Sequence, residues 1–298
     1  MDLLTRISLA LEYVEENLTD VIDHDALARI ACCSSYNFHR MFSYMTDMSL
    51  SEYIRRRKLT LAAIELKSSN TKVIDLAVKY GYDSPVSFTR AFQAMHGVTP
   101  TKARQGGVTL KAYPKISFQI SIKGEKGMDY RIETKEAFQV FGIEGVFRTD
   151  ETGEAPKTPA DLWQQCHSNG EYERLVNNAG DLPGFVSSDL CKVHAICSYR
   201  KMPEGTFPYT ICAFRSQNSR TDGYTVIDMP SHTWAIFPSK KFKWSEFDGV
   251  IETLYKRFFT EWLPTAEYEQ VDGISMEVYG GDDELGYVEL WFAVKKKA

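Results

Sequence analysis

Two glutamates near the end of the sequence have the type and spacing of a pair that could bind a cation. Glu277 lies in the alternating segment 274–279, and Glu289 lies in the alternating segment 286–295. Alternation with a period of two is typical of strands, so each segment is predicted to be a strand with one polar face. Two carboxylates on neighbouring strands repel each other unless a positive charge lies between them.

The aromatic residues beside these glutamates support the same chemistry. If Tyr279 pairs with Tyr287, the two glutamates fall directly opposite each other. Tyr279 and Trp291 then lie on the same face of the sheet as the carboxylates. Aromatic rings attract cations through their faces, and partial burial disfavours an unpaired carboxylate charge. The pattern favours a site for a positively charged ligand. Two alternatives stay open: both carboxylates are exposed surface groups, or one of them bonds a nearby Lys or Tyr.

Patterns for catalysis and for metal binding do not stand out in the sequence. The six histidines are scattered, and no Ser-His-Asp or Cys-His set is evident, although Glu289 could act as a general base. The six cysteines show no Cys-x-x-Cys spacing, and the sequence offers no four converging zinc ligands. We therefore predict a protein that is not an enzyme and that binds neither a metal nor a cofactor. A small-molecule hydrolase is the less favoured alternative.

Positive charge is concentrated in the first third of the chain. Residues 26–105 contain twelve Lys or Arg and five Asp or Glu, a local balance of +7 in a chain whose net charge is −5. Basic side chains can meet phosphate, whereas the acidic remainder would be repelled by it. No window approaches the roughly 20 apolar residues that a membrane span needs, and the first residues lack the pattern of a secretory signal. We expect a cytoplasmic protein with no membrane partner.

Two short motifs recur within this basic region. Phe38-His39-Arg40-Met41-Phe42 is repeated fifty residues later as Phe88-Thr89-Arg90-Ala91-Phe92, and Leu27-Ala28 is repeated as Leu76-Ala77. In the longer motif, the apolar residues have the spacing of a helix that buries one face. A repeated two-helix unit with a tight connection explains both recurrences.

The signals at the helix ends agree with this interpretation. Ser34 and Ser84 are suited to cap the second helix of each unit, and Pro85 suits the first position of its helix. The segment 51–67 between the units predicts a long helix. Its basic run 55–58 is either a solvated face or a functional one. We predict an all-α N-terminal domain with two helix-turn-helix units joined by a long helix.

The second helix of each unit has a polar face opposite its phenylalanines. Such a helix can enter the major groove of double-stranded DNA and present side chains to the base edges. The alternative for each side chain is phosphate contact or simple exposure. The candidate DNA-binding residues are Ser35, Tyr36, His39 and Arg40 on the first helix and Val86, Ser87, Thr89 and Arg90 on the second.

These motifs, in their order and spacing, resemble the DNA-binding domain of the AraC/XylS family of transcription regulators over residues 3–105. Besides the repeated motifs, the resemblance rests on residues 53–58, Ile74-Asp75, Gly81-Tyr82 and Gly97-Val98-Thr99-Pro100. The placement of this domain before a larger one is similar to the Rob subgroup. The resemblance implies a sequence-specific activator of transcription that binds double-stranded DNA, with RNA polymerase as a further partner. The base-reading positions that it implies are Tyr36, His39, Arg40, Val86, Ser87 and Arg90.

The character of the sequence changes after a glycine-containing linker. We place the DNA-binding domain at 1–107, the linker at 108–127 and a second domain at 128–298. The second domain is predicted to be a duplicated α+β domain with an antiparallel sheet, because the order of strand, helix and strands occurs twice. The predicted strands are 130–134, 138–147, 193–200, 209–215, 224–229, 233–237, 274–279 and 286–295, and the predicted helices are 159–178 and 245–262.

The second domain resembles the GyrI-like effector-binding domain over residues 128–297. The resemblance is clearest at 261–264, 275–279 and 288–294. It implies a small-molecule site, often for the lipophilic cations of multidrug sensing, with Glu289 as the usual anchor and Glu277 in the pocket wall. The candidate ligand-binding residues are Glu277, Tyr279, Glu289, Trp291, Phe147, Trp163 and Phe214.

The two resemblances together predict a transcription regulator that responds to a small cationic, aromatic or lipophilic effector. An alternative keeps the DNA-binding function but makes the acidic second domain a surface for contact with another protein.

Overall fold

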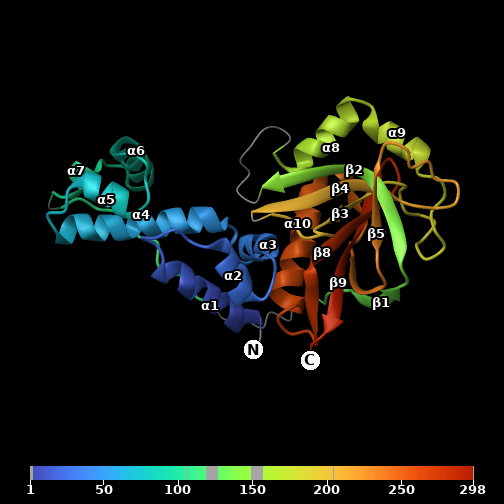
Figure 1. Cartoon of the computed structure of the whole chain (residues 1–298), viewed down its shortest axis with the longest axis horizontal. Coiled ribbons are helices and arrows are strands. Elements are labelled where there is room, and N and C mark those ends of the chain that lie inside the picture. The colour runs from blue at the N-terminus through green and yellow to red at the C-terminus, as the bar shows by residue number, and fades with distance from the viewer. Residues whose placement is uncertain (1–2, 106, 119–126, 149–156, 204, 298) are drawn as a thin grey trace. The chain divides into compact units, whose positions relative to one another are not determined.

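The chain forms two compact units in the computed structural model (Figure 1). Unit 1 comprises Met1–Cys32 and Thr46–Ser121, and unit 2 comprises Cys33–Met45 and Ile122–Ala298. A short segment of the N-terminal region therefore groups with the C-terminal part of the chain. Residues 119–126 of the predicted linker lie outside the described residues. The structure describes residues 3–105, 107–118, 127–148, 157–203 and 205–297.

The secondary structure described for unit 1 is helical. Its helices are α1 (Leu3–Glu16), α2 (His24–Ala31), α4 (Leu50–Ser68), α5 (Val73–Lys79), α6 (Pro85–His96) and α7 (Pro100–Ala103). Local caps set the helix ends: the Asp23 side chain accepts hydrogen bonds from backbone N–H groups in the first turn of α2, and Ser84 accepts one from the N–H of Ser87. Gly97, with φ of +76°, ends α6. These ends confirm the predicted second helix-turn-helix unit.

The long helix α4 supplies one side of the core of unit 1. Leu59 and Leu66 of α4 are buried in one cluster with Leu76 of α5 and with Phe88 and Phe92 of α6. Burial of one apolar face fixes the orientation of each helix about its own axis, because the opposite, polar face must then meet solvent. The polar face of α6 is consequently turned away from α4 and α5.

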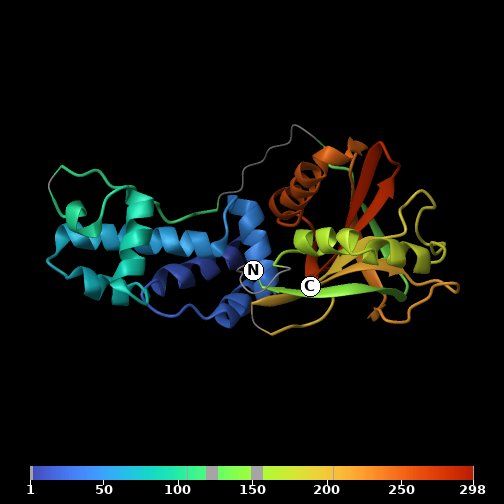
Figure 2. The ribbon, with the colours of Figure 1, turned by 90° about the horizontal axis from the view of Figure 1, so that it is seen from above.

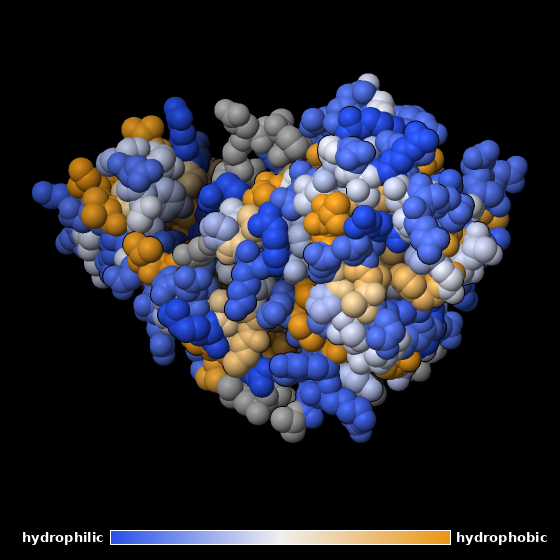
Figure 3. Space-filling view, turned by 45° about the vertical axis from the view of Figure 1, so that its right-hand side comes forward, coloured by the Kyte–Doolittle hydropathy of each residue, from blue (hydrophilic) through white to orange (hydrophobic). Residues whose placement is uncertain are grey.

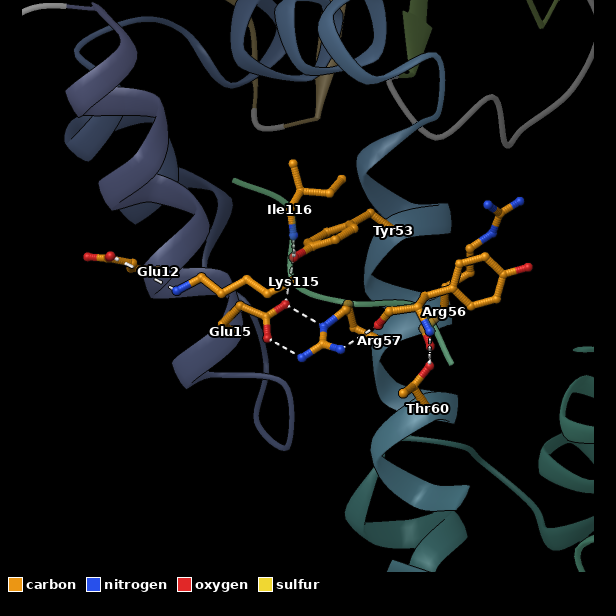
Figure 4. A network of polar contacts seen from close by, with 9 residues as sticks. Glu12, Glu15, Tyr53, Arg56, Arg57, Thr60, Lys115 and Ile116 are labelled. Atoms are coloured by element: carbon orange, nitrogen blue, oxygen red, sulfur yellow. Dashed lines mark hydrogen bonds and ion pairs between the residues drawn. The ribbon is translucent and has the colours of Figure 1, made fainter. Parts of the chain in front are cut away.

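Arg57, within the basic run 55–58, is not a solvated side chain but part of a mostly buried ion pair (Figure 4). Its guanidinium donates from Nε and Nη2 to the two carboxylate oxygens of Glu15 on α1, at 2.8 Å each, and from Nη1 to the carbonyl oxygen of Tyr113 at 2.5 Å. The Tyr53 hydroxyl donates to the same carboxylate at 2.7 Å. Both members of the ion pair are only 12% exposed. The network joins α1 and α4 to the segment around Tyr113.

Glu15→Gln is expected to lower the free energy of unfolding by about 1.5 kcal/mol, because a mostly buried guanidinium loses its charged partner. Burial opposes ionisation of Glu15, but hydrogen bonds from Arg57 and Tyr53 outweigh burial and hold the pKa of Glu15 below its usual value. A lowered carboxyl pKa stabilises the fold at neutral pH, and this stabilisation is lost as the pH falls through the lowered value. Urea unfolding at neutral and acidic pH measures both effects.

Glu12→Gln is the matched control for this experiment. The Glu12 carboxylate is 4.0 Å from the Lys115 ammonium and 54% exposed, so its loss should change stability little. The difference between wild type and Glu15→Gln should shrink in acid. A difference that stays constant with pH would contradict the importance of the ion pair.

Unit 2 is an α+β fold on one nine-stranded antiparallel sheet. Its strands are β1 (Arg131–Lys135), β2 (Phe138–Arg148), β3 (His194–Cys197), β4 (Thr206–Phe214), β5 (Thr225–Met229), β6 (His232–Pro238), β7 (Phe242–Lys243), β8 (Tyr268–Gly281) and β9 (Leu285–Lys296). The strand order is β1-β6-β9-β8-β3-β4-β2-β5, with β7 paired to β9. Its helices are α3 (Ser35–Thr46), α8 (Pro159–Ser168), α9 (Glu171–Asn178) and α10 (Phe247–Arg257), the last continued by a π-helical turn (Phe258–Trp262).

The predicted α+β class and antiparallel sheet are confirmed, with differences at three elements. The predicted helix 159–178 is two helices, because Gly170 adopts a φ of +79° between them. Strand β8 begins at Tyr268, and its register with β9 shifts between Gln270 and Ser275, an irregularity that hid the first part of the strand from a period-two pattern. The two-residue strand β7 was too short to be predicted.

The predicted pairing of the two glutamate-bearing strands is wrong by one residue. Tyr279 pairs with Val288 rather than with Tyr287. Paired residues share a face of a sheet, and successive residues alternate between faces. Glu277, two residues from Tyr279, therefore lies on one face, whereas Glu289, next to Val288, lies on the other.

The connection between β8 and β9 explains this register. Gly281 pairs with Gly286, and Gly281 adopts a φ of +114° at which a side chain would meet the Leu285 carbonyl oxygen. The Asp282 side chain accepts hydrogen bonds from the N–H groups of Glu284 and Leu285, at 2.9 Å each. This local turn fixes the alignment, and the alternating pattern of the strands does not contain it.

The two faces of the sheet have different coverings. One face, which we call the core face, carries a buried cluster that includes Trp234, Met276 and Trp291. The other, which we call the helix face, carries Glu277 and Phe292, and the Phe292 ring stacks on Phe258 with centroids 3.5 Å apart. Figure 2 shows α8 and α9 crossing over the strands.

Hydrophobic side chains on the surface occur as separate patches on the face shown in Figure 3. The exposed large hydrophobic residues of unit 1 include Ile64, Ile74, Val78 and Val86. Among the described residues, no helix combines the length and the apolar character that crossing a membrane requires.

Candidate functional site

Glu277 lies at the centre of a ring of tyrosines on the helix face. Its carboxylate accepts hydrogen bonds from the hydroxyls of Tyr279 at 2.5 Å, Tyr255 at 2.9 Å and Tyr209 at 3.3 Å. Burial is the main cause that raises the pKa of all three tyrosines well above its usual value, and the charge of Glu277 adds to it. Each hydroxyl therefore remains protonated and donates to the carboxylate.

Further aromatic side chains surround this ring of tyrosines. The Trp163 indole of α8 donates to the Tyr209 hydroxyl at 2.9 Å, and its ring meets Tyr279 edge-on at 5.7 Å. Phe247 of α10 lies 5.8 Å from Tyr279, and Phe147 of β2 lies 6.3 Å from Tyr209 between ring centroids. The structure thus brings together four predicted pocket residues: Glu277, Tyr279, Trp163 and Phe147. A carboxylate among aromatic rings has the chemistry of a site for an organic cation.

Glu289, Trp291 and Phe214 form a second group, on the core face. Glu289 is 6% exposed and accepts hydrogen bonds, each at 2.8 Å, from Tyr287, from the Trp291 indole and from Arg131. The Phe214 and Trp291 rings lie 6.2 Å apart within the buried cluster. The charge of Glu289 is therefore already balanced by an arginine, and its surroundings are packed.

Tyr209 and Tyr255 were not among the residues predicted from the sequence. Each is a single tyrosine within an otherwise ordinary strand or helix, so neither stands out in a search for motifs. The alternation of β4 places Tyr209 on the helix face, but that this face also carries Glu277 becomes clear only once the sheet is assembled. Within the described ranges, no group of three or more His, Cys, Asp or Glu side chains could hold a metal ion.

The helix α3 packs on the same face of the sheet, within unit 2. Its N-terminus is capped by Ser34, whose hydroxyl accepts a hydrogen bond from the N–H of Asn37 at 3.2 Å. The Tyr36 ring stacks on Phe207 of β4 at 3.8 Å, and the Tyr44 ring stacks on Tyr255 at 5.2 Å.

Arg40 lies between these two tyrosines on α3, one helical turn from each. Its guanidinium lies over the Tyr255 ring, 3.9 Å from the centroid, and donates to the Ser275 hydroxyl at 3.0 Å. Two of the predicted DNA-binding residues of α3 thus pack within unit 2: Tyr36 contacts the sheet, and Arg40 contacts the sheet and α10. His39 is half-buried, and the Ser35 hydroxyl is buried.

The predicted DNA-binding residues of α6 are placed differently. Val86, Ser87 and Arg90 are exposed, with Val86 60% exposed. The hydroxyls of Ser87 and Thr89 donate to backbone carbonyls of their own helix, at 2.8 and 2.7 Å. The outward face of α6 therefore presents one guanidinium, that of Arg90, next to short side chains.

Comparison with known proteins decides what the helical region is. The family model described as "Helix-turn-helix domain" matches residues 27–106. The chain is 40% identical over 98 residues to the HTH-type transcriptional activator AarP of Providencia stuartii. The aligned region covers 33% of this chain and 73% of AarP. It is also 36% identical over 94 residues to the multiple antibiotic resistance protein MarA of Escherichia coli. This aligned region covers 32% of this chain and 74% of MarA. This chain belongs to the AraC family of DNA-binding transcription regulators.

The remainder of this AraC-family regulator is an effector-binding domain. The family model described as "Integron-associated effector binding protein" matches residues 131–294, more than half of the chain. A solved structure of SAV2435 bound to tetraphenylphosphonium aligns with 56% of this chain and 94% of its own, at 18% identity and a TM-score of 0.42. The regulator is a transcription factor and not an enzyme, as predicted.

Proposed function

We propose that this AraC-family regulator senses a lipophilic or aromatic organic cation and that Glu277 is the anchor for its charge. The observation that carries the proposal is the Glu277 carboxylate, held by Tyr209, Tyr255 and Tyr279 beside Trp163. Within the described residues, Glu277 forms hydrogen bonds to hydroxyls but no ion pair. A carboxylate in an aromatic enclosure attracts a delocalised cation through charge and ring faces together.

Glu277 is a better anchor than Glu289 on electrostatic grounds. Glu289 is paired with Arg131 at 2.8 Å and is packed against Trp291. A ligand cation at Glu289 would have to displace this arginine from a buried carboxylate, which costs several kcal/mol of desolvation. We therefore propose that Glu289 and Arg131 hold the core face together and that the ligand binds on the helix face.

For the DNA-binding function, we propose that α3 and α6 read bases in the major groove. The base-reading side chains would be Ser35, Tyr36, His39 and Arg40 of α3, and Val86, Ser87, Thr89 and Arg90 of α6. We place the DNA-binding domain at 1–107 and the effector domain at 128–298. The protein would act in the cytoplasm as a transcription activator with RNA polymerase as its partner.

Titration calorimetry with tetraphenylphosphonium tests the ligand site. Glu277→Gln keeps the shape of the side chain and an oxygen for the tyrosine hydroxyls but removes the charge, so binding should weaken about tenfold or more. Glu289→Gln decides between the two carboxylates and should change the affinity much less. Equal affinity of wild type and Glu277→Gln would contradict the anchor role. The absence of saturable binding to wild type would instead favour a protein-contact role for this domain.

A further inference from the structure

We infer that Arg40 is an internal occupant of the Glu277 site, and that an effector cation competes with Arg40 and so releases α3 for DNA binding. This inference rests on the proposed function and adds the regulation of the same site. Its starting point is that one residue of α3, Arg40, offers the same chemistry as the proposed ligand: a delocalised positive charge that can lie on an aromatic face.

The contacts of Arg40 place it on Tyr255, one of the three tyrosines that bond Glu277. The ring of Tyr255 holds the guanidinium at 3.9 Å from its centroid, while the hydroxyl of the same Tyr255 donates to Glu277 at 2.9 Å. Ser275, which accepts a hydrogen bond from Arg40 at 3.0 Å, lies two residues before Glu277. Residues i and i+2 of a strand share a face and lie roughly 7 Å apart. Arg40 therefore uses the ring and strand face that a cation at Glu277 would use.

The neighbouring turns of α3 extend this contact. Tyr36 and Tyr44 lie four residues before and after Arg40 and thus on the same side of the helix. Tyr36 stacks on Phe207 at 3.8 Å and accepts a hydrogen bond from the Cys197 thiol at 3.3 Å, and Tyr44 stacks on Tyr255 at 5.2 Å. Three consecutive turns of α3 are therefore seated on the helix face.

One cavity of unit 2 lies next to the aromatic residues of the candidate site. A cavity of about 350 Å³ lies between β2 and α8, and its lining includes Phe147 but not Glu277. The Tyr255 side chain instead joins the two groups, because its hydroxyl bonds Glu277 and its ring carries the Arg40 guanidinium. A ligand cation that stacks on the Tyr255 ring beside Glu277 would have to replace the Arg40 guanidinium there.

The consequence for DNA binding follows from the use of one helix face for two purposes. While Tyr36 and Arg40 are packed on the sheet, they cannot lie in a major groove. A cation that binds only when Arg40 has left raises the population of free α3, and DNA that captures α3 leaves Glu277 open to the cation. Each ligand must then raise the affinity for the other by the same factor.

Arg40→Gln in the full chain, without DNA, tests the competition. Removal of the Arg40 charge should tighten tetraphenylphosphonium binding about three- to tenfold, because a smaller fraction of the protein then has side chain 40 in the cation site. Arg40→Lys keeps a cation at the site and should stay closer to wild type. Arg29→Gln removes the charge of an arginine of α2 whose side chain is 70% exposed, and it should not change the affinity.

Hydrogen exchange of residues 35–46 provides a second measurement that does not depend on a substitution. Saturating tetraphenylphosphonium should speed exchange in α3 if the cation displaces it. Unchanged exchange in α3, or an affinity of Arg40→Gln equal to that of wild type, would overturn the competition while leaving the ligand site intact. If neither wild type nor Arg40→Gln binds the cation, the proposed ligand class fails, and the inference fails with it.

Discussion

Gly142→Ala is expected to destabilise unit 2 by about 3 kcal/mol or more, a larger effect than that of any other substitution considered for this protein. Gly142 lies in the middle of β2, where it pairs with Cys212 of β4 and Thr225 of β5. A Cβ atom at this position would lie 1.9 Å from the Ile211 carbonyl oxygen and 2.7 Å from the Cys212 Cα atom. These are backbone atoms of a central strand, so no side chain can rotate to make room.

Gly249→Ala is the matched control for this prediction. Gly249 lies within α10, and a Cβ atom there would have no neighbour within 4 Å. Alanine is favoured over glycine in a helix by up to about 1 kcal/mol, so this variant should be as stable as wild type or more stable. Thermal unfolding measures both variants. A melting temperature of Gly142→Ala equal to that of wild type would contradict the close approach of β2 and β4.

Arg90→Ala is expected to weaken binding to a specific operator by about 1–3 kcal/mol, the discrimination that an arginine provides when it bonds a guanine edge. The outward face of α6 offers Arg90 beside Val86 and Ser87, so the base reading proposed for this helix would depend on one guanidinium. The full chain can select its operator from a pool of random duplexes, and footprinting then compares the variants on that sequence. Arg40→Ala should also lower operator affinity, because α3 would lose the corresponding side chain.

The salt dependence of binding separates base reading from phosphate contact at Arg90. If Arg90 reads a base, the variant should lose discrimination at one base pair and keep most of the salt slope. If Arg90 contacts a phosphate, binding should weaken uniformly across sequences and the slope should fall by about one. Arg220→Ala, which removes an exposed arginine from unit 2, is the control for net charge. A footprint of Arg90→Ala identical to that of wild type would contradict the recognition role of α6.

The sequence predicted the helical region well because its signals are local. Ser84, Pro85 and Gly97 mark the ends of α6 through interactions with their own helix, and these interactions form in the structure as expected. The run 55–58 could not be interpreted in the same way. Whether Arg57 is solvated depends on Glu15, which lies 42 residues earlier in the chain and meets it only when α1 packs on α4.

The candidate ligand site was predicted less completely because it depends on register and on distant pairs. Glu277 and Glu289 look equivalent in the sequence, and the Gly281–Gly286 turn alone places them on opposite faces. Tyr255 lies on a helix, 22 residues before Glu277 in the chain, and meets Glu277 only when that helix packs on the sheet. The position of Arg40 on the sheet was also outside what a pattern in α3 could indicate, since the same outward face suits a major groove or an aromatic surface.

The dissociation constant of the full chain for its selected operator, measured with and without saturating tetraphenylphosphonium, shows whether the cation and DNA binding are coupled through α3. A cation that binds at Glu277 and releases α3 should lower this constant, and bound operator should tighten cation binding by the same factor. Glu277→Gln should abolish most of the coupling while retaining operator binding. An operator affinity that is unchanged or weakened by saturating cation would contradict this account.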